Sequence, residues 1–319
     1  MIKELRKLGV GAHVAGVFMG VACYADDVIL IAPSRQAMEI MLESVEKFAK
    51  EYNIYFSTDP DPRKSKSKCI YMTGKSRNLP KPSPLVLCGN DLPWVESATH
   101  LGHELNESGS MDHDALIKRA QFVQKSVEIR SMFHWAAPAD VITALKTYCS
   151  SFYGSMLWDL SGASAKQVFT AWDVAVKLVW DCPRATRTFL LQQVLSCGLS
   201  SAKTDVLCRY SKFFNSLRNS VSMEVRVLCN LVAKDLQSTT AKNVKLIEDL
   251  TNHQDICTAT QESIREALIT SERVTVSPQD EWRTPYLSSL LSQYQEAKSI
   301  SDDGLIEYLN SLICSLAIG

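Results

Sequence analysis

Residues 14–32 read VAGVFMGVACYADDVILIA and decide what kind of fold the chain can adopt. Two apolar runs, 17–24 and 28–31, flank the tripeptide Ala25-Asp26-Asp27. Apolar and β-branched residues on both sides of a short polar segment are typical of an antiparallel hairpin. We therefore expect strand 17–24, a turn at the two acids, and strand 28–31.

The adjacent carboxylates of Asp26 and Asp27 are the strongest chemical signal in the chain. Two like charges between apolar strands repel one another, and a divalent cation relieves that repulsion. Mg²⁺ takes oxygen ligands and is commonly held by one or two carboxylates together with substrate phosphates. The pair is thus a candidate metal site, although Tyr24-Ala25-Asp26-Asp27 alone is a weak signal, because a solvated turn can contain two acids by chance.

Outward from this hairpin, the strand signals continue for about ninety residues and then stop. Pro33 ends the second strand, and Ser34 can cap an amphipathic helix over 35–52. Short strands are predicted at 54–56 and 69–72, and a second hairpin at 85–95. Helical periodicity follows at 112–133, from Pro138 to about 156, and at 164–181, 186–197, 201–235, 239–251, 258–271, 284–298 and 302–317. The predicted fold class is α+β, with antiparallel strands and one or two helices in front and an all-α remainder.

Composition excludes several classes of protein. The 319 residues are 46% hydrophobic and 22% charged, which is ordinary for a globular chain and excludes disorder throughout. Ten cysteines without a Cys-x-x-Cys pair indicate free thiols in a reducing compartment, and hence an intracellular protein of nucleus or cytoplasm that is not secreted. The apolar run 8–23 is too short for a membrane span, so no membrane partner is expected. The net charge of −1 does not by itself indicate nucleic acid.

Several blocks in one order resemble the reverse transcriptases of non-LTR retrotransposons, of the LINE-like, jockey/chicken-repeat type. Residues 9–34, GVGAHVAGVFMGVACYADDVILIAPS, resemble the active-site hairpin of these enzymes. Further blocks resemble the segments that follow it in the family: helix 35–52, FSTDPDPRKSKSKCIYM (56–72), LPWVESATHLGHEL (92–105), DALIKRAQFVQKSVEIRSMF (114–133), LKTYCSSFYGSMLWDLSG (145–162) and AWDVAVKLVWDCPRATRTFLL (171–191). The resemblance covers roughly residues 1–195.

The resemblance implies an organisation and a set of roles. Residues 1–95 would be a partial palm, 96–197 a helical thumb-like region, and 198–319 an acidic helical region. Asp26 would bind a catalytic metal and Asp27 would support it, with Mg²⁺ as cofactor. Tyr24 would pack by the primer terminus, and Lys66 or Lys68 would lie near the incoming nucleotide. The primer-grip hairpin would contain Trp94, Leu101 and Gly102. RNA template and DNA primer would be the partners of the intact enzyme.

Basic side chains add candidate contacts to a nucleic-acid backbone. Arg63 and Lys64 open a stretch, 63–81, that contains no acidic residue, although such a stretch also suits a solvated loop. Arg184 and Arg187 begin a helix of the thumb-like region, where contact with a duplex and simple surface exposure are equally open.

One departure from the family pattern bears on activity. The family uses a further metal-binding aspartate from a strand before the hairpin, whereas Glu4 is the one acid before Asp26 and does not match it. We therefore expect a C-terminal fragment of such an enzyme, with an incomplete sheet, weak Mg²⁺ binding and little or no polymerisation. The alternatives are a non-catalytic helical module that binds nucleic acid or protein, and an unrelated helical protein in which the Asp-Asp turn is incidental.

Overall fold

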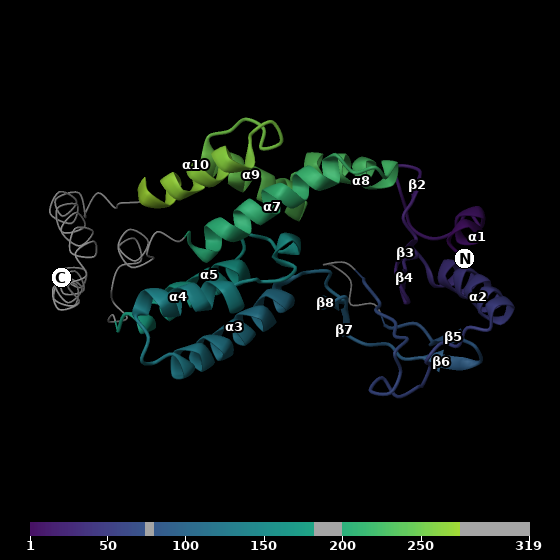
Figure 1. Ribbon diagram of the computed structural model, residues 1–319. Helices are drawn as coiled ribbons and strands as arrows, with labels where there is room; N and C mark the ends of the chain where they lie inside the picture. Colours follow the sequence, from purple (N-terminus) through teal and green to yellow (C-terminus); the bar gives the residue numbers. More distant parts are fainter. Residues whose placement is uncertain (74–79, 182–199, 275–319) are drawn as a thin grey trace, which may run out of the picture. The chain divides into compact units, whose positions relative to one another are not determined.

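A computed structural model describes residues 1–73, 80–181 and 200–274, and it has the predicted α+β class (Figure 1). The chain divides into two compact units. One unit contains residues 1–111 together with 218–231, and it holds every strand described below. The other contains the described parts of 112–217 and 232–319, and its regular structure is helical.

Four separate antiparallel hairpins make up the strands of the first unit. They are β1 (His13–Val14) with β2 (Val17–Phe18), β3 (Val21–Tyr24) with β4 (Asp27–Leu30), β5 (Leu85–Leu87) with β6 (Asn90–Leu92), and β7 (Ser97–His100) with β8 (His103–Asn106). Each sheet is two-stranded within the described residues, so each hairpin keeps unpaired backbone edges there.

The predicted first strand, 17–24, is wrong as a continuous strand. Val17 pairs back to Val14 across the turn Ala15-Gly16, and β3 begins only after Gly20. A Cβ on Gly20 would lie 2.6 Å from the Phe18 ring, so the chain folds closely over that ring at this glycine. The hairpin of β3 and β4 then continues to the predicted acids.

Three of the four hairpins turn through a pair of residues with positive φ, and Ala15 and Gly16 between β1 and β2 are the first such pair. Cys88 and Gly89 connect β5 to β6 with φ values of 52° and 79°, and Leu101 and Gly102 connect β7 to β8 with 49° and 77°. Positive φ at both positions is the type I′ geometry, which matches the twist of paired strands. The second predicted hairpin is therefore present, but it turns at 88–89 rather than at 89–91.

The core of the first unit lies between helices and the strand pair β5–β6. Helix α1 (Ile2–Lys7) contributes Leu5, and α2 (Arg35–Tyr52) contributes Met41, Leu42 and Val45. As predicted, Ser34 caps α2, because its Oγ accepts a hydrogen bond from the Ala37 N–H at 3.2 Å. The strands supply Leu85, Leu87 and Leu92, and Val21 and Leu30 pack against the same cluster.

Two short strands that were predicted are absent from the structure. The N–H of Ile54 donates to Ala49 O at 2.8 Å, so residues after α2 complete a helix C-terminus instead of joining a sheet. Cys69 makes a single parallel bridge to Trp94, and no longer strand forms over 69–72. In both places the local sequence favours a strand, but within the described residues 54–56 pair with no strand, and 69–72 pair only at the single bridge between Cys69 and Trp94.

The helical unit confirms most of the periodicity predictions. Its elements are α3 (Asp112–Met132), α4 (Pro138–Tyr148), the short 3₁₀ helix η1 (Ser155–Leu157), α5 (Ala163–Val179), α7 (Ala202–Arg218), α9 (Thr239–Thr251) and α10 (Gln261–Val274). The helix predicted from Pro138 to about 156 ends at Tyr148. The predicted helices at 186–197, 284–298 and 302–317 lie outside the described residues.

The helix predicted over 201–235 is two helices, α7 and α8 (Met223–Lys234). Serines interrupt it, because the Ser222 Oγ accepts from Val225 N at 3.3 Å and the Ser220 Oγ accepts from Ser222 N at 3.2 Å. Side chains that bond to nearby backbone in this way compete with helical hydrogen bonds. In the first unit, α8 is tied to α1 by the ion pair of Arg6 and Glu224 at 3.1 Å.

Across residues 1–73, 80–181 and 200–274, no helix combines the length and the apolar character that a membrane span requires.

Candidate functional site

The two acids lie at the exposed tip of the hairpin of β3 and β4. Tyr24 pairs with Asp27, so Ala25 and Asp26 form a two-residue turn and Asp27 is the first residue of β4. Ala25 adopts a φ of 53°, which is uncommon for a residue with a Cβ. Both carboxylates are exposed, and no hydrogen bond or ion pair engages them among the residues described.

The register places Asp27 on the face of the hairpin that points away from the core. Cross-strand partners share a face, and faces alternate along each strand. Val21 and Leu30 form one pair and pack on the core cluster, so Tyr24 and Asp27 lie on the opposite face. Tyr24 is 69% exposed and Ile31 is 49% exposed. The hairpin thus presents an aromatic ring and a carboxylate side by side to solvent.

The donor set at this tip suits one weakly held cation. Two neighbouring carboxylates offer oxygen ligands of the kind Mg²⁺ prefers, with the remaining positions left to water. A clamp of two metal ions needs more fixed oxygens than these. Within the described ranges, no group of three or more His, Cys, Asp or Glu side chains is arranged to hold a metal ion.

The predicted phosphate contacts of the 63–81 stretch divide into two kinds. The Arg63 guanidinium bonds both carboxylate oxygens of Asp61 at 3.2 Å, and the Arg63 N–H donates to the same carboxylate. These bonds lower the pKa of Asp61 and pair Arg63 with that carboxylate. Lys64, Lys66 and Lys68 are exposed, around a buried Ser65 whose hydroxyl donates to Ser67 O at 2.6 Å.

The residues predicted for a primer grip differ in exposure. Trp94 packs against the core cluster and meets the Tyr71 ring edge-on at 5.8 Å, so it acts here as a packing residue. Leu101 and Gly102 form the turn between β7 and β8, where Leu101 is exposed. Arg184 and Arg187 lie outside the described residues.

The cysteines of the first unit allow a direct test of this geometry. Burial raises the pKa of the Cys69 thiol to about 11, whereas Cys23 near the hairpin tip and Cys88 in the β5–β6 turn are exposed. The thiolate is the reactive form, and with this pKa only about 0.1% of Cys69 is ionised at pH 8. We expect iodoacetamide at pH 8 to alkylate Cys23 and Cys88 well before Cys69, measured by mass spectrometry of peptides. Equal rates at Cys69 and Cys88 would contradict the placement of Cys69.

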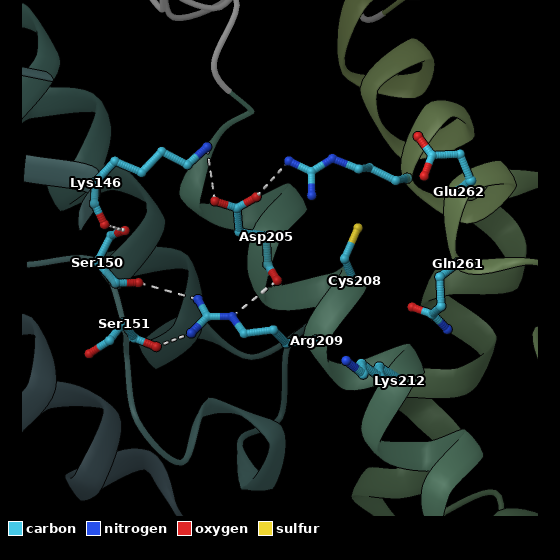
Figure 2. Close-up of a pocket in the computed structure, with 10 residues that line it drawn as sticks. Lys146, Ser150, Ser151, Asp205, Cys208, Arg209, Lys212, Gln261 and Glu262 are labelled. Carbon is cyan, nitrogen blue, oxygen red and sulfur yellow. Dashed lines mark hydrogen bonds and ion pairs between the residues drawn. The ribbon is translucent and has the colours of Figure 1, made fainter. Parts of the chain in front are cut away.

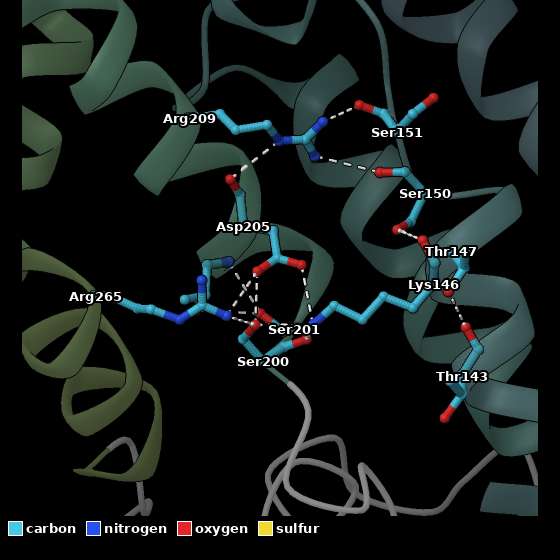
Figure 3. A network of polar contacts seen from close by, with 11 residues as sticks. Thr143, Lys146, Thr147, Ser150, Ser151, Ser200, Ser201, Asp205, Arg209 and Arg265 are labelled. Atoms are coloured by element: carbon cyan, nitrogen blue, oxygen red, sulfur yellow. Dashed lines mark hydrogen bonds and ion pairs between the residues drawn. The ribbon is translucent and has the colours of Figure 1, made fainter. Parts of the chain in front are cut away.

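A second site, which the sequence did not reveal, lies among α4, α7 and α10 of the helical unit. The Asp205 carboxylate pairs with the Lys146 ammonium at 3.0 Å and with the Arg265 guanidinium at 3.6 Å (Figure 3). The Lys146 Nζ also donates to the Ser200 carbonyl and hydroxyl oxygens at 2.7 and 2.8 Å. The Ser200 hydroxyl donates to Asp205 at 2.6 Å and accepts from Arg265 at 2.9 Å.

Arg209, one turn after Asp205 on α7, binds the chain that follows α4. Its guanidinium donates to the carbonyl oxygens of Ser150 and Ser151, and its Nε donates to Asp205 O at 3.2 Å. A cation at this position suits the negative end of α4. Burial lowers the pKa of Arg209, and the nearby Asp205 carboxylate opposes that effect.

These side chains line a cavity of about 430 Å³ (Figure 2). Its charged lining comprises four cations, Lys146, Arg209, Lys212 and Arg265, and two anions, Asp205 and Glu262, for a net charge of +2. In sequence these residues are scattered over more than a hundred positions, so no local motif marks them.

Comparison of the chain with models of protein families and with curated proteins gives no match.

Proposed function

We propose that this chain is part of an RNA-directed DNA polymerase of the LINE-like type, and that it does not extend primers by itself. The single observation that supports the proposal is the hairpin of β3 and β4. It holds Asp26 in its turn and pairs Asp27 with Tyr24 on an exposed face. An RNA template and a DNA primer would be the partners of the whole enzyme.

In this proposal, Asp26 and Asp27 would hold Mg²⁺, which supplies charge neutralisation for phosphoryl transfer. The exposed ring of Tyr24 would lie against the end of the primer strand, because it shares a face with Asp27. The exposed lysines 64, 66 and 68 would contact phosphates, while Arg63 would serve mainly to order the loop through Asp61.

A second candidate, a non-catalytic module that binds nucleic acid, is favoured by one observation in the helical unit. The cavity lined by Lys146, Arg209 and Arg265 carries a net positive charge, and this charge does not depend on the hairpin acids. A module of this kind would bind without any contribution from Asp26 or Asp27.

Metal binding at the hairpin tests the first proposal. We expect the full chain to bind Mn²⁺, used as a probe for Mg²⁺, with a Kd of about 1 mM, because two exposed carboxylates form an incomplete oxygen cage. The double variant Asp26→Asn/Asp27→Asn should bind Mn²⁺ about tenfold more weakly by electron paramagnetic resonance. Asp91→Asn, which removes an exposed acid from the β6 hairpin, is the matched control and should change nothing.

Two outcomes would contradict this proposal. Equal Mn²⁺ affinity in the wild type and the double variant would show that the tip is a solvated turn without a metal role. Primer extension on an RNA template by the purified chain, abolished by Asp26→Ala, would overturn the expected inactivity and show that a further acid completes the site.

A further inference from the structure

The cavity of the helical unit has cations that its own carboxylates do not neutralise. The Asp205 carboxylate already forms ion pairs with Lys146 and Arg265, and these pairs connect α4, α7 and α10 (Figure 3). Arg209 has carbonyl oxygens as its hydrogen-bond partners. Lys212, one turn further along α7, is exposed and forms no ion pair in the described part of the chain.

Arg209 is prepared to bind an anion. A guanidinium has five N–H donors, and the three contacts to carbonyl oxygens leave two of them. Its orientation is fixed by those three contacts, so little side-chain freedom is lost on binding. Burial lowers the pKa of Arg209, which means that its positive charge is poorly solvated, and an anion in the cavity would restore the missing stabilisation.

The first turn of α10 adds to this positive environment. Gln261 and Glu262 begin the helix, and both line the cavity with Arg265 from the next turn (Figure 2). The N-terminal end of a helix carries partial positive charge, which favours a phosphate or a carboxylate nearby, although the Thr260 hydroxyl already accepts from the Ser263 N–H at 3.1 Å. Glu262 opposes an anion at the same place, and so reduces the affinity of the cavity without closing it.

We propose that this cavity binds a phosphate group, held by Arg209 and Lys212. Lys146 and Arg265, which pair with Asp205, offset the repulsion between that carboxylate and the phosphate. The net charge of +2 matches a phosphate dianion, and about 430 Å³ lies within the range of small-molecule sites. Arginine forks and lysine ammonium groups are the usual phosphate ligands of proteins. The phosphate would be free, a phosphomonoester, or part of a nucleic-acid backbone. The proposal uses none of the hairpin residues of the proposed polymerase function and does not depend on it.

The test uses the full-length chain and three probes: inorganic phosphate, adenosine 5′-monophosphate and a single-stranded DNA oligonucleotide. We expect Lys212→Glu to weaken phosphate binding about tenfold or more by calorimetry, because it replaces an attracting charge with a repelling one. Lys245→Glu makes the same change at an exposed position of α9 outside the cavity, and should alter affinity less than about twofold.

A gain of affinity separates this proposal from a loss of folding. Glu262→Gln removes the exposed opposing carboxylate and should strengthen phosphate binding about threefold, which a misfolded protein cannot do. If Lys212→Glu weakens binding of the oligonucleotide as well, the natural ligand is the phosphate of a nucleic-acid backbone. If it weakens binding of only the two smaller probes, the natural ligand is free phosphate or a phosphomonoester. Absence of phosphate binding, or equal binding by Lys212→Glu and Lys245→Glu, would overturn the proposal whatever the hairpin does with metal.

Discussion

Replacing Trp158 by alanine is expected to lower the free energy of unfolding of the helical unit by about 4 kcal/mol or more. Trp158 is 1% exposed, and its indole packs near Phe152 with ring centroids 6.3 Å apart. Its Nε1–H donates to the buried Asp114 Oδ2 at 2.8 Å. Truncation would therefore create a large cavity and also deprive a buried carboxylate of a donor, and both effects destabilise.

The measurement is hydrogen exchange in increasing urea, followed in peptides from α3 and α5, because it reports on this unit alone. Trp158→Phe keeps most of the ring volume but removes the N–H, so it should cost about 1–3 kcal/mol. Trp135→Ala is the control, since Trp135 is 75% exposed and its loss should change stability by less than about 0.5 kcal/mol. Similar effects at Trp158 and Trp135 would contradict the burial described here.

Replacing Asp205 by alanine is the second change with a large expected effect. The side chains of Asp205 and Lys146 are only 18% and 19% exposed, and Arg265 shares the same carboxylate. Removing one partner of a mostly buried pair leaves the cations uncompensated, so the helical unit should lose about 3 kcal/mol. Hydrogen exchange in peptides from α4, α7 and α10 measures this loss.

A double variant separates charge from packing in this cluster. Lys146→Met removes one of the cations that Asp205→Ala leaves unpaired, so the two changes together should cost less than the sum of the single variants. Asp249→Ala, an exposed acid on α9, is the control and should change stability by less than about 0.5 kcal/mol. If the losses of stability caused by Asp205→Ala and Lys146→Met simply add in the double variant, the ion pair does not stabilise the packing of these helices.

Local chemistry determined one hairpin, the start of α2 and several helices. The acids at 26–27 between two apolar runs predicted the hairpin of β3 and β4, and Ser34 predicted the start of α2, because a turn or a cap depends on residues within a few positions. The 3.6-residue periodicity placed α3, α5, α9 and α10 to within about three residues, since each buries its own apolar face.

Only the tertiary structure decided which apolar runs become strands and which side chains meet. Residues 54–56 and 69–72 have strand-like composition, but a strand also needs a partner, and among the described residues the fold gives 54–56 none and 69–72 only the bridge from Cys69 to Trp94. The bonds from Ser200 to Lys146 and to Arg265 join residues 54 and 65 positions apart, and nothing in their local sequence signals the encounter. The packing of α4, α7 and α10 brings these charges together. A partly buried ion pair depends on the distance between the two charges in space, and not on their spacing along the chain.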